Sequence, residues 1–308
     1  MGNKIKIVTL LLMFIAIKGF TQQDPMYTQY MNNPLIINPA YAGTRGLPVL
    51  TGVFRKQWVG IEGAPETSTI SYQTPVRRYN FGAGANLIFD VVGPVTQTGL
   101  YLDYSYLISF EEHGTLSLGL NAGMDYYHVD YRNLRYNNPD DDINASEPVS
   151  LFLPNFGVGT FYYTDRVYLG LSVPKLLRNS LEKGSVEIEH LNREEWHWFL
   201  MGGAIFHLNP TIDFKPSFIA RMTQGAPLSV DLSGVFMLYE KVWLGVNYRF
   251  NESLGGIIRW QISPSLEIGY SYDYTNIGYG PLNKGSHEIL ISYSFVQKQR
   301  RLLSPRYF

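Results

Sequence analysis

The sequence predicts an all-β fold, a transmembrane antiparallel outer-membrane β-barrel of about 14 strands with a non-barrel N-terminal segment. Three observations predict this fold. Only 17% of the 308 residues are charged although 15% are aromatic, whereas soluble domains usually carry about 25% charge. Apolar and polar residues alternate along many short segments. The connections between these segments are alternately short and long, which is typical of barrels that cross an outer membrane.

Composition excludes several other classes of protein. The formal net charge is −1, so the chain offers no basic field for nucleic acid. It contains no cysteine, which excludes disulfide frameworks, thiol nucleophiles and thiolate metal sites. At 45% hydrophobic residues the chain is too apolar to remain disordered. We therefore expect a folded protein whose surface contacts lipid.

The N-terminus resembles a targeting segment rather than part of the fold. Lys4 and Lys6 precede an apolar run at 7–17, and small and polar residues follow. A run of about eleven apolar residues is too short to span a bilayer comfortably, so residues 1–21 are expected to be a secretory signal peptide. An uncleaved membrane anchor is the alternative.

Residues 22–46 do not alternate and are expected to lie outside the barrel wall. Asp24 and Pro25 predict the start of a short helix that ends near Asn32, and two Asn-Pro pairs predict turns after it. About fourteen strands enclose more space than side chains fill, so this segment could plug the lumen; a periplasmic arm folded under the barrel is the alternative. The residues expected to hold the segment against the barrel are Tyr27, Tyr30, Asn33, Pro34, Asn38, Pro39 and Tyr41.

Residues 47–296 carry the period-two pattern of the predicted barrel. From Leu266 to Tyr274, large apolar and aromatic residues alternate with Glu, Gly, Ser and Asp. Alternation places one class of side chain on each face of a strand. One face is large and apolar and the other is small and polar, so we expect the first to contact lipid and the second to line the lumen.

Connection lengths predict the orientation. If the last strand, at roughly 286–296, runs toward the periplasm, then the connections at 78–79, 111–113, 164–165, 209–210, 239–241 and 263–264 are all short periplasmic turns. The long connections at 130–151, 174–195 and 275–285 then lie outside the cell. Short inner turns and long outer loops predict an outer-membrane location, with membrane lipid as one partner.

The inward positions carry charges of both signs, namely Arg55, Asp90, Asp103, Asp125, Asp213, Lys215, Arg221, Asp231, Arg249, Arg259, Glu267 and Asp273. Buried charges need partners, so we expect a network across the lumen that holds a plug and blocks leakage. Charged groups that set the selectivity of an open pore are the alternative.

No catalytic, cofactor or metal site is predicted. Ser286, His287 and Glu288 supply the residue types of a catalytic triad, but neighbouring strand residues point to opposite faces. The acidic run at 140–144 resembles the start of a calcium loop, yet Ala145 replaces the turn glycine and Leu151 replaces the bidentate glutamate. A solvated acidic loop is the preferred interpretation, and the chain is expected not to be an enzyme.

Several motifs together resemble one family. They are Asp24-Pro25-Met26-Tyr27-Thr28-Gln29-Tyr30, Asn33-Pro34, Asn38-Pro39-Ala40-Tyr41-Ala42-Gly43, Arg55-Lys56-Gln57-Trp58, Gly170-Leu171-Ser172-Val173-Pro174, Gly285-Ser286-His287-Glu288 and Ser304-Pro305-Arg306-Tyr307-Phe308. They resemble the PorP/SprF family of type IX secretion system outer-membrane proteins of Bacteroidota. The resemblance implies a noncatalytic barrel that helps to secrete, retain or present client proteins such as gliding adhesins. It also implies docking of periplasmic components that reach the peptidoglycan.

Residues 297–308 are expected to form a periplasmic tail. Each Lys or Arg near the membrane midplane would cost about 2–4 kcal/mol, so the basic run at 298–301 must leave the barrel. The residues expected to dock a periplasmic partner are Leu302, Leu303, Arg306, Tyr307 and Phe308. A frayed basic terminus is the alternative. For the whole chain, a diffusion or uptake channel for small solutes remains the alternative to a secretion-associated barrel.

Overall fold

Fifteen strands form one antiparallel sheet in the computed structural model, which describes residues 27–111, 113–130, 148–179, 195–275 and 283–296. The strands are β1 (Val49–Lys56), β2 (Glu66–Val76), β3 (Phe81–Val92), β4 (Val95–Phe110), β5 (Gly114–Val129), β6 (Val149–Tyr163), β7 (Val167–Val173), β8 (His197–Ala204), β9 (Phe206–Asn209), β10 (Ile212–Thr223), β11 (Ser229–Leu238), β12 (Val242–Arg249), β13 (Ser253–Gln261), β14 (Leu266–Thr275) and β15 (Ser286–Ser294).

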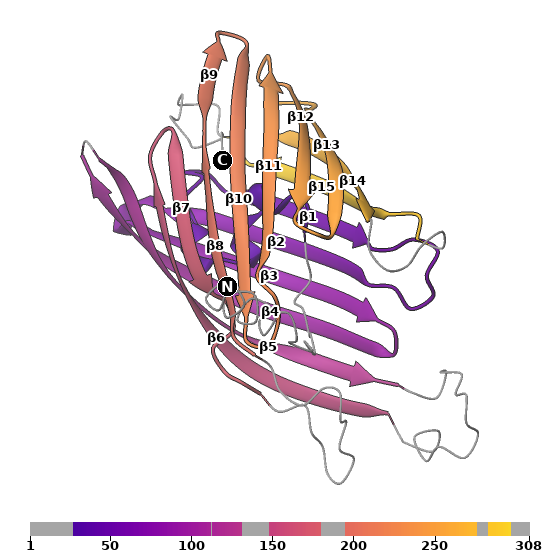
Figure 1. Ribbon diagram of the computed structural model, residues 1–308. Helices are drawn as coiled ribbons and strands as arrows, with labels where there is room; N and C mark the ends of the chain where they lie inside the picture. Colours follow the sequence, from indigo (N-terminus) through magenta and orange to yellow (C-terminus); the bar gives the residue numbers. More distant parts are fainter. Residues whose placement is uncertain (1–26, 112, 131–147, 180–194, 276–282, 297–308) are drawn as a thin grey trace, which may run out of the picture.

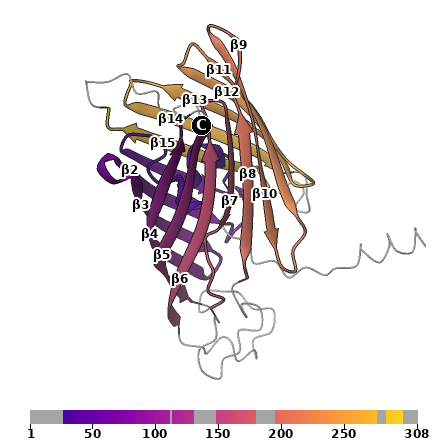
Figure 2. The same cartoon turned by 90° about the vertical axis from the view of Figure 1, so that its left-hand side faces the viewer.

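The sheet closes into a ring (Figures 1 and 2). Each strand pairs with its neighbours along the chain, and β1 pairs with β15 over the full length of β1. Both β8 and β9 pair with the same side of β10, so they are two parts of one interrupted strand. Fifteen strands minus this one duplication give fourteen positions in the ring. The predicted fold class is confirmed.

The connections follow the predicted alternation of sides. The side on which β15 ends carries short turns throughout, for example residues 111–113 between β4 and β5 and residues 164–166 between β6 and β7. The opposite side carries the long connections between β5 and β6, between β7 and β8, and between β14 and β15. It also carries short turns, such as residues 93–94. We call the end of the ring with the long connections the outer end.

The two faces of the wall differ in polarity. On β4, β5 and β6 the outward side chains of Leu102, Leu120 and Phe152 are 62%, 57% and 70% exposed. The inward side chains Asp103 and Asn155 are buried. This arrangement is inverted relative to a soluble barrel, because an apolar outer face is stable only against lipid.

The segment before β1 forms three 3₁₀ turns, η1 (Tyr30–Asn32), η2 (Pro34–Ile36) and η3 (Pro39–Tyr41), and a fourth, η4 (Arg77–Tyr79), lies between β2 and β3. The helix predicted to end near Asn32 is thus a single 3₁₀ turn in its described part, because Asn33 precedes a proline and leaves the helical region. Asp24 and Pro25 lie outside the described residues. Within the described ranges, no helix is both long and apolar enough to cross a membrane.

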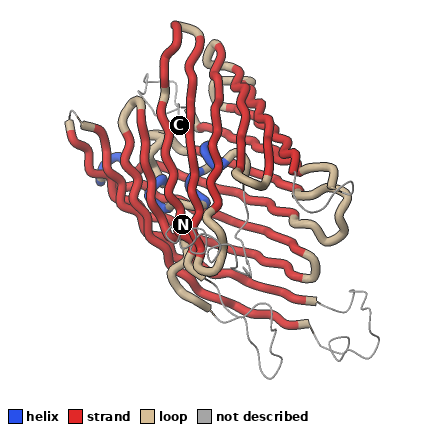
Figure 3. The backbone as a smooth tube through the Cα atoms, in the orientation of Figure 1, coloured by secondary structure: helices blue, strands red, loops and turns tan. Residues whose placement is uncertain are grey.

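Residues 27–46, which we call the lumen segment, lie inside the ring (Figure 3). The segment makes hydrogen bonds to strands on all sides of the ring, including β1, β2, β4, β6, β7 and β15. Only a chain that passes through the interior can contact strands on opposite walls. The lumen is therefore occupied by the protein's own chain.

We expect an epitope inserted after Asn144, between β5 and β6, to be accessible on intact cells, because this connection lies at the outer end. An epitope added after Phe308 should react only after the outer membrane is permeabilised. Antibody labelling of whole and permeabilised cells measures both, and reversed accessibility would contradict the orientation.

Candidate functional site

A buried group of charges holds the beginning of the lumen segment. Glu288 on β15 accepts hydrogen bonds from the backbone N–H groups of Thr28 and Gln29, at 2.8 and 2.9 Å. The Arg55 guanidinium on β1 lies 3.1 Å from Glu288, 2.8 Å from Asp273 on β14 and 2.6 Å from the Thr28 hydroxyl. The Thr28 hydroxyl donates in turn to Asp273. Three strands and the lumen segment therefore meet in one ion-pair cluster, which we call the Arg55 cluster.

Polar side chains of the wall satisfy the backbone of the lumen segment along the rest of its path. The Ser172 and Ser105 hydroxyls donate to the carbonyl oxygens of Ile37 and Ala42, each at 2.6 Å. The backbone N–H of Gly43 donates to Gln73 at 3.1 Å. Irregular backbone buried away from water needs such partners, because each unpaired polar group is costly. The small polar residues of the inner face supply them.

Glycines in the wall allow the lumen segment to pack directly against the strands. A Cβ atom at Gly119 would lie 2.1 Å from the Ala40 backbone nitrogen, and one at Gly82 would lie 2.1 Å from the Ala42 carbonyl oxygen. No side chain larger than hydrogen fits at either position while the segment keeps its place. The segment is thus seated in the wall, rather than loosely enclosed by it.

Apolar contacts also hold the lumen segment against one side of the ring. Tyr41 packs edge-on against Phe161 of β6, with the ring centroids 5.3 Å apart. The buried apolar cluster also includes Tyr30 and Leu35 of the segment, with Met201 from β8. Sequence analysis expected the inward positions to be small and polar. An apolar patch on part of the inner wall was missed, because this patch faces protein rather than water.

All seven predicted contact residues of the N-terminal segment are buried inside the ring, namely Tyr27, Tyr30, Asn33, Pro34, Asn38, Pro39 and Tyr41. The Asn33 amide donates to Ser71 at 2.9 Å. Asn38 caps η3 by accepting from the Ala40 N–H at 3.0 Å and donates to the Thr160 carbonyl at 3.0 Å. The Tyr30 hydroxyl lies 3.4 Å from both Ser217 and Ser233.

The predicted lumen charges are bonded to several different partners. Asp231 pairs with Arg221 and Arg249 at 2.9 Å each, and Arg259 pairs with Glu267 at 3.1 Å. Further pairs are Arg55 with Asp273, Asp125 with Lys175, and Asp213 with His207. Asp90 accepts a hydrogen bond from the Thr67 hydroxyl, and Asp103 accepts one from the Asn86 amide. Lys215 lies 3.6 Å from the Met237 sulfur and 5.8 Å from the Trp243 ring.

Two charged residues of the site were missed. Glu288 shares the inward face of β15 with Ser286 and Ser292, all fully or almost fully buried, and alternation along β15 could have placed it there. His287 points outward and its Nδ1 lies 2.7 Å from the Tyr270 hydroxyl, so neighbouring residues do occupy opposite faces. The second missed residue is Lys175, which follows the short strand β7. It lies outside any alternating segment, so the sequence pattern does not predict that its side chain points into the ring.

One histidine also contacts a predicted lumen charge. The turn between β9 and β10 brings Asp213 within 2.7 Å of the Nδ1 atom of His207. Within the described ranges, no group of three or more His, Asp or Glu residues is arranged to hold a metal ion. The acidic run with Asp140, Asp142 and Asn144, and the tail residues Leu302, Leu303, Arg306, Tyr307 and Phe308, lie outside the described residues.

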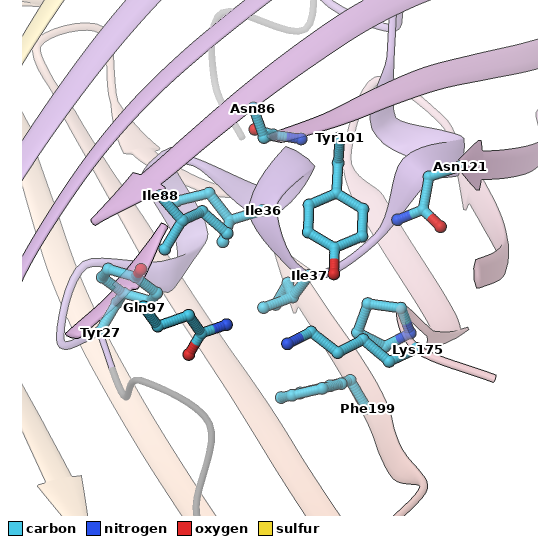
Figure 4. A pocket seen from close by; sticks show the side chains of 11 residues that line it. Tyr27, Ile36, Ile37, Asn86, Ile88, Gln97, Tyr101, Asn121, Lys175 and Phe199 are labelled. Carbon is cyan, nitrogen blue, oxygen red and sulfur yellow. The ribbon is translucent and has the colours of Figure 1, made fainter. Parts of the chain in front are cut away.

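A cavity of about 50 Å³ lies between the lumen segment and the outer end of the ring. Figure 4 shows its walls, which include Ile36 and Ile37 of the segment, Ile88 of β3, Tyr101 of β4 and Phe199 of β8. We call it the outer pocket. Lys175 extends into it and bonds Asp125 at 2.9 Å.

The chain is similar to one protein family and to several solved structures. The profile of the family described as type IX secretion system membrane protein PorP/SprF matches residues 19–293. No curated protein matches the chain. Among solved structures, the outer membrane protein Omp33 of Acinetobacter baumannii is 6% identical, with a TM-score of 0.47 over 81% of this chain and 98% of that one. A FadL homologue of Pseudomonas aeruginosa is 14% identical, with a TM-score of 0.46 over 90% of this chain and 95% of that one.

Substituting Gly119→Ala should displace the lumen segment, because the new methyl group would overlap the Ala40 backbone. Overpacking of this kind costs about 1–3 kcal/mol. We expect faster uptake of a small hydrophilic dye by cells, with an unchanged amount of assembled barrel. Gly256→Ala is the matched control, since no atom lies within 4 Å of a Cβ built there. Equal dye uptake by the two variants would contradict the close packing of the lumen segment against Gly119.

Substituting Arg55→Ala should lower the free energy of unfolding by about 3–5 kcal/mol, because it leaves two carboxylates buried without their cation. Urea titration of the purified barrel in lipid vesicles measures this. Lys56→Ala is the control: Lys56 is the next residue, lies half-exposed and pairs with Glu66 at the surface, where ion pairs contribute little. A loss of similar size in both variants would show that the Arg55 cluster does not hold the segment.

Proposed function

The chain belongs to the PorP/SprF family of type IX secretion system membrane proteins, and from this membership we propose that it helps to secrete, retain or present client proteins at the cell surface. It is an outer-membrane barrel of that secretion system. We further propose that it is noncatalytic, that its clients include gliding adhesins, and that it docks periplasmic components linked to the peptidoglycan.

The filled lumen is the observation that carries this proposal. A conduit for folded or unfolded clients needs a continuous opening, whereas residues 27–46 cross this lumen and are bonded to strands around it. Removing the segment would expose the Arg55 cluster and the glycines against which it packs. A barrel with a seated internal segment suits a protein that holds others at the membrane better than one that passes them through.

The alternative function is an outer-membrane diffusion or uptake channel for small solutes. It rests on the barrel architecture, which many unrelated functions share. Mixed charges lining a wide, open lumen would support it. Here the charges are paired across short distances and several are bonded to the lumen segment, so we consider the channel the weaker proposal.

The periplasmic side provides the second part of the proposal. The tail residues Leu302, Leu303, Arg306, Tyr307 and Phe308 combine apolar anchors with an arginine that can pair with a carboxylate. β15 ends on the side of the short turns, which supports a periplasmic position for the tail that follows it. We propose that this tail contacts the periplasmic secretion machinery.

Removing the whole chain from its bacterium should abolish the surface display of at least one secreted protein, and restoring the chain should restore it. Surface proteomics of intact cells measures this. The purified barrel should show no steady conductance in a planar bilayer, because its lumen is filled. Steady open conductance together with unchanged surface proteins would favour the channel.

A further inference from the structure

We propose that the inner rim of the ring binds an extended, basic segment of a periplasmic protein, which pairs with an open edge of β9 and crosses an acidic groove beside that edge. The inference rests on the proposed function, because it concerns the docking of periplasmic components. It adds the place at which such a partner binds and the chemistry that recognises it.

Strand β9 has an open edge. Pairing between β7 and β8 ends where β7 begins, and just beyond it Ile205 donates its backbone N–H to the Arg166 carbonyl at 2.7 Å. From there the chain continues as β9, which pairs with β10 alone among the described residues. Backbone groups of successive strand residues point to alternate sides, so the N–H and C=O of His207 point to the same side as the Ile205 N–H. We call this open side of β9 the β9 edge.

The β9 edge lies on the periplasmic side of a charged turn. Asp165 and Arg166, between β6 and β7, are both exposed. Charged side chains are costly among lipid tails, so this turn lies at or beyond the inner surface of the membrane. The Arg166 carbonyl is bonded to Ile205, which directly precedes β9. The four residues of β9 therefore extend about 13 Å farther along the strand, at about 3.3 Å per residue, so a periplasmic protein can reach them (Figure 1).

An open strand edge selects an extended peptide, because its backbone N–H and C=O groups pair with those of another strand. The side chains of Phe206 and Leu208, on either side of His207, are 54% and 58% exposed. An added strand would therefore gain apolar contacts besides its backbone hydrogen bonds. A second copy of the chain in the same membrane would hold its β9 in the same direction, so it could not extend the antiparallel sheet. The occupant is a segment of a different protein.

A groove along the inner rim meets the β9 edge at the same turn. Its volume is about 610 Å³, and it lies between the β4–β5 turn and the β6–β7 turn. Asp165, which precedes Arg166, lines it together with Glu111. No Lys or Arg belongs to its described lining, whereas the rings of Phe110 and Tyr162 do. Two carboxylates beside aromatic rings favour a peptide that carries Lys or Arg next to apolar residues.

Two comparisons test the backbone pairing. Full-length barrels are held in neutral-lipid nanodiscs, and binding of fluorescein-labelled Lys-Val-Lys-Val-Lys-Val-Lys-amide is followed by fluorescence anisotropy. His207→Pro removes the open N–H and spares the bonds to β10, since proline is tolerated where that group faces solvent, whereas His207→Ala keeps it. We expect the dissociation constant to be at least fivefold higher for His207→Pro than for His207→Ala. The same peptide with every backbone nitrogen methylated should bind the unchanged barrel at least tenfold more weakly.

The charge of the groove is tested separately. Glu111→Gln combined with Asp165→Asn should raise the dissociation constant of the Lys peptide about tenfold. Glu66→Gln, at a half-exposed residue of the outer end, is the control and should leave it unchanged. The matching Glu-Val peptide should bind the unchanged barrel at least tenfold more weakly than the Lys peptide.

Each element of the proposal has an outcome that would overturn it. These outcomes are equal binding by His207→Pro and His207→Ala, equal binding of the methylated peptide, and equal binding of the Lys and Glu peptides. Binding that occurs only when the chain is ended after Val296 would also overturn it, because the surface would then belong to the chain's own tail.

In cells, His207→Pro should reduce the surface display of the client at least fivefold, because docking places the barrel at the secretion machinery, while Glu66→Gln should not. If deletion of the chain removes the client from the surface but His207→Pro leaves it there, the β9 edge is not the docking surface although the proposed function stands. If deletion of the chain leaves all surface proteins in place, the proposed function itself fails.

Discussion

A ring of fourteen strands is too wide to be filled by its own inward side chains, and the rest of this structure depends on that constraint. Eight strands give a filled barrel and sixteen an open pore. In this fourteen-stranded ring, residues 27–46 occupy the interior that the inward side chains would leave unfilled. The inner wall is built accordingly, with glycine where backbone meets backbone, hydroxyls and amides where the segment's carbonyls need donors, and buried ion pairs at its beginning.

The apolar part of the inner wall shows how the segment alters the ordinary division of polarity in a membrane barrel. Phe161, Tyr168 and Met201 would be unfavourable next to water, but they pack against Tyr41 and Tyr30. The wall and the segment therefore stabilise each other. Neither is a satisfactory structure alone, because an empty ring would expose an aromatic patch and a free segment would expose three tyrosines.

The sequence was sufficient to predict the strands and their sides. Alternation from Leu266 to Tyr274, and the contrast between short and long connections, follow from chemistry that is local in the chain. The same alternation predicts that the side chain of Glu288 points inward, although the sequence analysis did not count it among the lumen charges. By contrast, the contact of Asn38 with β6 or of Ala40 with Gly119 depends on how the closed ring twists, which no local pattern records. The inward direction of the Lys175 side chain likewise depends on the closed ring, so it could not be predicted from the sequence.

The Arg55 cluster joins residues that are far apart in the chain, and this has a consequence for biogenesis. Thr28 and Glu288 are separated by 260 positions, and Arg55 lies on the first strand while Glu288 lies on the last. The seat for the start of the lumen segment is complete only when β1 has paired with β15, so the segment cannot dock before the seam closes. Because contacts over long loops form late, its docking is a final step that reports a correctly closed barrel, and an unclosed intermediate would retain an open, leaking interior.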